Sequence, residues 1–199
     1  MRVLDLFSGF GGWSQAFVTA GHEVMRIENN PLLKDIPHTN LMCVKEFRDW
    51  IIEQQERGYA LARPDLILAS PPCLEFSNAY NAPRAEAQRG GIDFKPDMEL
   101  VEVTLEIIQL LCPKYFIVEN VNGSQKFFEP YFGKPKQKIG AYVLYGNFPE
   151  IIISGQLPTK KSKDKRHSPL RSNYRAEIPL PLSLGALTAI LEQKYITDF

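Results

Sequence analysis

Three short segments hold the residue types that a catalytic set needs. Ser70-Pro71-Pro72-Cys73 follows the apolar run 65–69, which is typical of a buried strand. Each proline fixes its own φ and lacks an N–H, so the chain leaves the sheet there in a stiff turn. Segments 5–12 and 119–121 also end apolar runs. Ligands bind beyond the carboxyl ends of parallel strands, so we expect a cysteine nucleophile, a glycine-rich loop and a carboxylate to converge there.

The glycine-rich loop indicates a small ligand. Gly9, Gly11 and Gly12 allow a tight turn from strand to helix and a close approach of the ligand to the backbone. The spacing is neither the dinucleotide fingerprint G-x-G-x-x-G nor a P-loop, which favours a smaller adenosyl ligand. Glu28, at the end of the next predicted strand, is placed to accept hydrogen bonds from ribose hydroxyls. A purely structural glycine turn beside an exposed glutamate is the alternative.

Strand and helix patterns alternate along the first two-thirds of the chain. This alternation predicts one α/β domain over residues 1–199, with a mostly parallel sheet and helices on both faces. A long polar loop is expected at 78–96, and Asp97 is the expected N-cap of the helix that follows it. The predicted strands are 3–7, 22–27, 65–69, 115–118 and a closing pair within 140–153; the predicted helices are 9–20, one around 47–54 that stops at Gly58, one ending near 111, and 183–195.

Composition is that of an ordinary globular protein. Hydrophobic residues make up 44% and charged residues 23%, and neither a membrane span nor a signal peptide is evident. An intracellular, cytoplasmic location without membrane association is therefore expected. The three cysteines fit neither a disulfide framework nor a zinc pattern, so no metal site is expected. Cys43 and Cys112 are predicted to be small buried residues.

The charge is unevenly distributed although the formal net charge is zero. A basic stretch at 159–176 could hold a polyanion such as a nucleic acid. A solvated surface loop is the equally plain alternative. Its basic residues are Lys160, Lys161, Lys163, Lys165, Arg166, Arg171 and Arg175.

Segments 5–12, 70–77 and 119–121 resemble, in the same order and at similar intervals, three motifs of the cytosine-5 DNA methyltransferases. The resemblance is strong over residues 1–125 and weak beyond. It implies the Rossmann-like fold of S-adenosylmethionine-dependent methyltransferases, with DNA as the partner and S-adenosylhomocysteine as the product. It makes Cys73 the nucleophile, Glu119 the residue that works on the base, and Pro72 the residue that holds the sulfur. The implied cofactor-binding residues are Asp5, Phe7, Ser8, Gly9, Gly11, Gly12, Glu28, Asn29 and Pro71.

The chemistry of the reaction requires these residue types. Carbon 5 of cytosine is a weak nucleophile until a thiolate adds to carbon 6 and a proton reaches nitrogen 3, which makes carbon 5 an enamine carbon. Cys73 would supply the thiolate and Glu119 the proton. The target base must also leave its stack, and the loop 74–91 is the natural closing element. Ser77, Asn78, Arg84 and Arg89 in this loop are the expected nucleic-acid contacts.

The C-terminal third departs from the family. Its Gln-x-Arg-x-Arg segment is not found, and Arg171 and Arg175 are candidate substitutes. The interval from Val121 to Ile178 leaves no room for a target-recognition domain of the usual size. Low sequence specificity, a short recognition loop or a specificity-supplying protein partner is therefore expected. The same chemistry on RNA or on a free pyrimidine nucleotide, and a non-catalytic accessory protein, remain alternatives.

Overall fold

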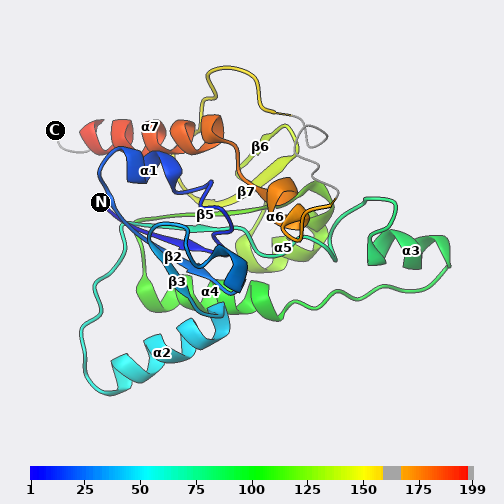
Figure 1. Cartoon of the computed structure of the whole chain (residues 1–199), viewed down its shortest axis with the longest axis horizontal. Helices are drawn as coiled ribbons and strands as arrows, with labels where there is room; N and C mark the ends of the chain where they lie inside the picture. Colours follow the sequence, from blue (N-terminus) through cyan, green and yellow to red (C-terminus); the bar gives the residue numbers. More distant parts are fainter. Residues whose placement is uncertain (159–166, 197–199) are drawn as a thin grey trace.

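A seven-stranded sheet forms the centre of the molecule (Figure 1). The computed structural model describes residues 1–158 and 167–196. The strand order is β3-β2-β1-β4-β5-β7-β6; β1 to β5 pair in parallel, and β7 pairs antiparallel with β5 and with β6. The strands are β1 (Arg2–Leu6), β2 (Glu23–Glu28), β3 (Thr39–Leu41), β4 (Leu66–Ala69), β5 (Tyr115–Val121), β6 (Gln137–Ile139) and β7 (Tyr142–Asn147).

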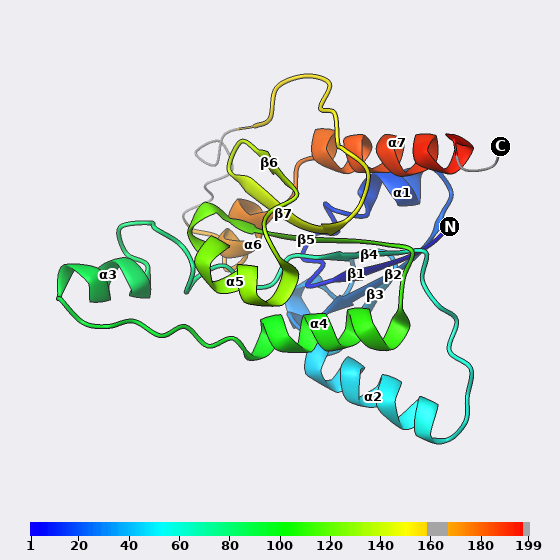
Figure 2. The ribbon, with the colours of Figure 1, turned by 180° about the vertical axis from the view of Figure 1, so that it is seen from behind.

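Helices cover both faces of the sheet (Figures 1 and 2). One face packs on α1 (Gln15–Thr19) and α7 (Leu180–Ile196), and the other on α2 (Val44–Glu56), α4 (Glu99–Leu111) and α5 (Gln125–Phe132). Alternate strand residues serve the two cores: in β4, Leu66 and Leu68 face the first and Ile67 and Ala69 the second. The remaining helices are α3 (Pro83–Arg89), α6 (Arg171–Ala176) and two 3-10 turns at Pro31–Leu33 and Asn122–Ser124.

The predicted α/β architecture is confirmed, and most predicted elements lie within a few residues of their observed bounds. The helix predicted at 9–20 is wrong in its first half. Gly9 and Gly11 have φ values of 55° and 77°, in the left-handed region, so a regular helix begins only at Gln15. The N-cap of α4 is Met98 rather than Asp97, although the Asp97 carboxylate does accept a hydrogen bond from the Glu99 amide.

Several elements at the edges of the sheet differ from expectation. The closing strands occupy residues 137–147, so the second half of the predicted span is wrong, and β3, α5 and α6 were not predicted. Cys112 is exposed and takes a left-handed conformation after α4, and Cys43 is half-buried, so the prediction that both are buried is also wrong. The polar loop contains α3, which projects from the body on an extended arm (Figures 1 and 2).

The five basic side chains predicted at 160–166 fall outside the described residues. Among the residues that are described, no helix is both long and apolar enough to cross a membrane.

Candidate active site

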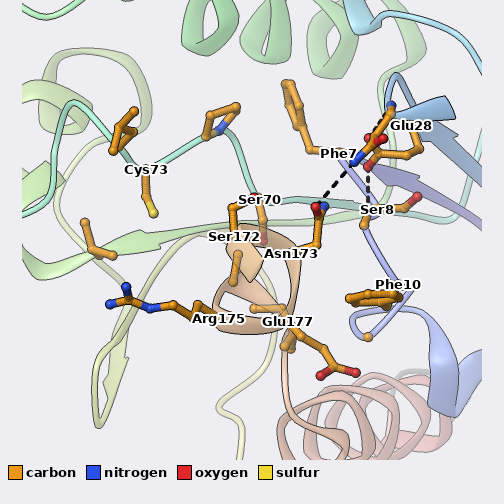
Figure 3. A pocket seen from close by; sticks show the side chains of 18 of the residues that line it. Phe7, Ser8, Phe10, Glu28, Ser70, Cys73, Ser172, Asn173, Arg175 and Glu177 are labelled. Atoms are coloured by element: carbon orange, nitrogen blue, oxygen red, sulfur yellow. Dashed lines mark hydrogen bonds between the residues drawn. The ribbon is translucent and has the colours of Figure 1, made fainter. Parts of the chain in front are cut away.

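The carboxyl ends of β1, β2 and β4 open into one cavity of about 890 Å³. Its walls come from the glycine-rich loop after β1, the end of β2, the turn after β4 and the segment around α6. A volume of this size falls within the range of small-molecule and cofactor sites. Figure 3 shows Cys73 on one side of this cavity and Phe7, Ser8 and Glu28 on the other.

A buried cation supports the glycine-rich loop from below. The Arg26 guanidinium donates to the Ser14 hydroxyl at 2.9 Å and to the Gly11 carbonyl at 3.1 Å. A Cβ at Gly11 would overlap this guanidinium, so glycine is required there for packing as well as for its positive φ. The Ser14 hydroxyl donates to Asp5 Oδ2 at 2.6 Å. Asp5 and Gly11 therefore shape the loop from beneath and are not among the residues that line the cavity.

Burial dominates the electrostatics of this cluster. Removal of Asp5 from water raises its pKa from 3.8 to about 6, although the Ser14 hydrogen bond and the charge of Arg26 act in the opposite direction. The pKa of Arg26 is lowered by burial and partly restored by Asp5. The carboxyl group under the loop is therefore about half protonated near pH 6 and mostly ionised at neutral pH.

Two polar side chains, those of Glu28 and Ser8, line the cavity beside the glycine-rich loop. Glu28 accepts hydrogen bonds from the backbone amides of Gly9, at 2.7 Å, and Asn30, at 2.8 Å, which fixes its carboxylate at the end of β2. The Ser8 side chain is buried at the cavity wall, and within the described part of the chain its hydroxyl has no hydrogen-bond partner. A buried unpaired hydroxyl in a cavity wall is a natural contact for a ligand.

The turn after β4 holds Cys73 rigidly. The Asn120 side-chain amide donates to the Pro71 carbonyl at 2.9 Å, so β5 secures the proline pair. Beyond it, the amides of Phe76 and Ser77 both donate to the Cys73 carbonyl. Pro72, Cys73 and Ser77 line the cavity, whereas Pro71 is buried behind it.

Glu119 lies deeper, within β5 and beside the turn. Its side chain is 9% exposed, and its Oε2 accepts a hydrogen bond from the Ser70 hydroxyl at 3.1 Å. The neighbouring Tyr142 on β7 has its pKa raised to about 12, first by burial and then by the negative charges of Glu119 and Glu177. Glu119 is thus a buried carboxyl group one layer behind the cavity wall.

The segment around α6 forms the opposite wall. The ring of Tyr174 packs on that of Phe10 with 4.7 Å between centroids, and the Asn30 side chain donates to Asn173 Oδ1 at 3.4 Å. The Ile178 carbonyl lies so close to Gly12 that a Cβ at Gly12 would overlap it. The absence of a side chain at Gly12 therefore allows the C-terminal segment to pack against the loop.

The predicted nucleic-acid contacts fall into two groups. Arg171, Arg175 and Ser77 line the cavity. Arg84 and Arg89 lie on α3, in the arm: Arg84 donates to the Gly123 carbonyl at 2.6 Å, and Arg89 lies 4.0 Å above the Tyr80 ring. Asn78 packs close to Gly123, at the base of the arm. Arg84 thus secures the arm to the residues that follow β5.

Eleven of the residues expected from the sequence line the cavity and seven do not. Those that line it are Phe7, Ser8, Gly9, Gly12, Glu28, Asn29, Pro72, Cys73, Ser77, Arg171 and Arg175; those that do not are Asp5, Gly11, Pro71, Asn78, Arg84, Arg89 and Glu119. Sequence reasoning missed Ser70, Ser172, Asn173 and Glu177, which also line it. Ser70 belongs to the motif that contains Cys73 but was given no role of its own, whereas no periodic or motif signal marks the other three, because they reach the cavity only through long-range packing.

Comparison with known proteins agrees with the geometry. The C-5 cytosine-specific DNA methylase family matches residues 1–139. The Type II methyltransferase M1.HphI of Haemophilus parahaemolyticus is 29% identical over 150 residues, which cover 70% of this chain and 36% of that protein. The human tRNA (cytosine(38)-C(5))-methyltransferase is 29% identical over 133 residues, covering 62% of this chain and 31% of that protein.

A solved structure described as a prophage-encoded DNA modification methyltransferase of E. coli is 24% identical, with a TM-score of 0.44, and covers 66% of this chain and 35% of that one. The chain belongs to the C-5 cytosine-specific DNA methylase family, and its sheet has the Rossmann-like fold of S-adenosylmethionine-dependent methyltransferases. It spans about one third of the length of these curated relatives.

Proposed function

We propose that this protein transfers a methyl group from S-adenosylmethionine to carbon 5 of cytosine in DNA, through a covalent adduct with Cys73. The observation that carries the proposal is the single cavity lined by Gly9 and Glu28 at one end and by Cys73 at the other, with Glu119 buried behind it. One connected space can therefore bring a methyl donor and a target base together.

The first half of the cavity fits the cofactor. The Glu28 carboxylate suits ribose hydroxyls, the unpaired Ser8 hydroxyl offers a further polar contact, and Gly9 keeps the wall free of a side chain. Phe7 and Asn29 complete this end. When bound, the cofactor supplies an electrophilic methyl group on a sulfonium and leaves as S-adenosylhomocysteine. No metal is assigned a role.

The second half supplies the covalent chemistry. The Cys73 thiolate adds to carbon 6 of cytosine while Glu119 supplies or shares a proton at nitrogen 3, so that carbon 5 carries the electron pair that accepts the methyl group. A base then removes the carbon-5 proton, and the Cys73–carbon-6 bond breaks to restore the aromatic ring. Pro72 fixes the direction of the sulfur, because its φ is set by the ring.

Substrate binding is assigned to the basic residues that surround the cavity mouth. Arg171 and Arg175 line it and can neutralise phosphate or contact the base. The arm that carries α3, with Ser77, Asn78, Arg84 and Arg89 along it, is the segment we expect to close over an extruded base.

Sequence recognition is expected to be limited or shared. The interval between Val121 and Ile178 already contains β6, β7 and α6, which leaves little of it for side chains that read base edges. We therefore propose that methylation has low sequence specificity, or that a protein partner supplies specificity.

The test is methyl transfer from radiolabelled S-adenosylmethionine to DNA, RNA and deoxycytidine monophosphate, with Cys73→Ser in parallel. Label at carbon 5 of cytosine in DNA, lost in Cys73→Ser, is the expected result. Preferential label in RNA would contradict DNA as the substrate and would indicate RNA instead, the class of substrate in the name of the human relative. Cofactor binding without transfer to any of the three would overturn the proposal and indicate an accessory role.

A further inference from the structure

A hydrogen-bond chain connects the glycine-rich loop to Glu119. The Trp13 indole Nε1–H donates to the Ser70 hydroxyl at 2.9 Å, and the Ser70 hydroxyl donates to Glu119 Oε2 at 3.1 Å. Trp13 is 2% exposed, so its indole is held in place by the core between the sheet and α1 and α7. The three side chains come from three different elements that meet at the carboxyl edge of the sheet.

The direction of this chain follows from the chemistry of its first member. An indole N–H can only donate, so the Ser70 oxygen must accept from Trp13. A serine hydroxyl has a single proton, and with one lone pair engaged by Trp13 that proton is directed to Glu119 Oε2. The position of a hydroxyl hydrogen is usually variable, but here a rigid donor on one side and an unprotonated Oε2 on the other determine it.

We infer that Ser70 is a positioning residue for Glu119: oriented by Trp13, it engages Oε2 so that the proton needed at the base is carried on the other carboxyl oxygen, Oε1. This inference rests on the proposed function. A donated hydrogen bond favours the ionised carboxylate, so Ser70 also counteracts the effect of burial, which favours the protonated acid. Glu119 is thereby kept able to exchange its proton.

Other titratable groups also lie near Glu119. Tyr142 lies on the same face of the sheet as Glu119, diagonally across from it on β7, and burial raises its pKa to about 12, so it is uncharged near neutral pH. Tyr145 lies on the opposite face of the sheet. The negative charge of Glu177 also acts on Tyr142, and Cys73 follows Ser70 by three residues on the β4 turn. Trp13 directly follows Gly12, so the same chain connects the cofactor loop to the catalytic carboxyl group.

The direct test is a titration of Glu119 that does not depend on activity. Carbon-13 NMR of protein labelled at the glutamate carboxyl groups follows each resonance against pH, and Glu119→Gln identifies the signal. Ser70→Ala should raise the pKa of Glu119 by about one pH unit, a tenfold gain in proton affinity, whereas Ser70→Thr keeps a hydroxyl and should restore the wild-type value. Trp13→Phe should shift it in the same direction by less.

Ser124→Ala is the matched control. Ser124 is fully buried and follows β5, the strand that carries Glu119, but its hydroxyl donates to the Val121 carbonyl and contacts the Tyr145 hydroxyl rather than Glu119. It should leave the Glu119 titration unchanged even if stability falls. An unchanged or lowered pKa in Ser70→Ala, or an equal rise in Ser124→Ala, would overturn the inference.

The pH profile of kcat for methyl transfer gives a second readout. Because the reaction needs protonated Glu119, the alkaline limb in Ser70→Ala should move to higher pH by the shift seen in the titration, with a lower maximum. A limb that does not move contradicts the inference. If wild-type protein methylates nothing, the proposed function fails, while the NMR titration still decides whether Ser70 acts on Glu119.

Discussion

The two walls of the cavity are built by different means. The strand-end wall (residues 7–12, 28–29 and 70–73) consists of residues that come directly after β1, β2 and β4, so the sheet itself brings them together. The α6 wall (residues 171–178) is held by a ring contact, a long side-chain hydrogen bond and a backbone approach to Gly12. In the proposed function, the strand-end wall carries the chemistry and the α6 wall closes the cavity.

The largest expected effect concerns the buried charge under the strand-end wall. The pKa of Asp5 is about 6 in the folded protein and near 3.8 when unfolded, so the folded state binds the proton more tightly. The contribution of Asp5 to stability is therefore full below about pH 4 and falls as pH rises through 6. Relative to Asp5→Asn, the free energy of unfolding of the wild type should fall by about 3 kcal/mol over that window.

Urea denaturation of both proteins between pH 3.5 and 7 measures this difference. Asp93→Asn, at an exposed position on the arm, is the control and should track the wild type. A difference between wild type and Asp5→Asn that is flat with pH would show that folding leaves the pKa of Asp5 unchanged, and a wild-type advantage that increases with pH would show that folding lowers it.

The next effect tests the ligand contacts of the strand-end wall. Glu28→Ala removes a carboxylate that is fixed by two backbone amides and that we propose binds the ribose, so S-adenosylmethionine should bind about 100-fold more weakly. Isothermal titration calorimetry measures this affinity. Glu23→Ala, at the exposed start of the same strand, should bind normally; equal losses in the two variants would contradict the assignment.

The junction of the two walls is tested by Gly12→Ala. The new methyl group would overlap the Ile178 carbonyl, so either the loop or the C-terminal segment must move, at a cost of about 1–3 kcal/mol in unfolding free energy. Gly90→Ala is the matched control, because a Cβ at Gly90 meets only ordinary contacts and its φ is −79°. If thermal unfolding shows equal losses of stability in the two variants, the segment that contains Ile178 does not pack tightly against Gly12.

The smallest effect is expected in the α6 wall itself. Tyr174→Ala removes the ring that packs on Phe10, which is worth about 0.5–1.5 kcal/mol. Cofactor affinity should fall by roughly 3- to 10-fold, with kcat largely retained. Tyr59→Ala, at a largely exposed position after α2, should change neither quantity. If kcat fell as much as in Cys73→Ser, α6 would take part in the catalytic step, and the proposed difference between the two walls would be wrong.

Local sequence was a good guide wherever geometry is local. A strand end followed by Pro-Pro-Cys, or by glycines, can face only one edge of a parallel sheet, and Cys73, Gly9 and Glu28, which the sequence places at strand ends, do line the cavity. The same reasoning was wrong for the start of α1, because the left-handed backbone at Gly9 and Gly11 delays the helix. It also assigned all three glycines to the cofactor, although two of them make room for Arg26 and Ile178.

By itself, the sequence determined the α/β order of the chain, the three motifs and the chemistry they imply, because these depend on residue types and on periodicity over a few turns or strands. The tertiary structure alone decided that α6 closes the cavity, that Arg26 and Asp5 lie beneath the loop, and that Trp13 reaches Glu119 through Ser70. These contacts join residues far apart in sequence, and their partners are selected by packing of the whole core. No pattern in a short window of residues records that packing.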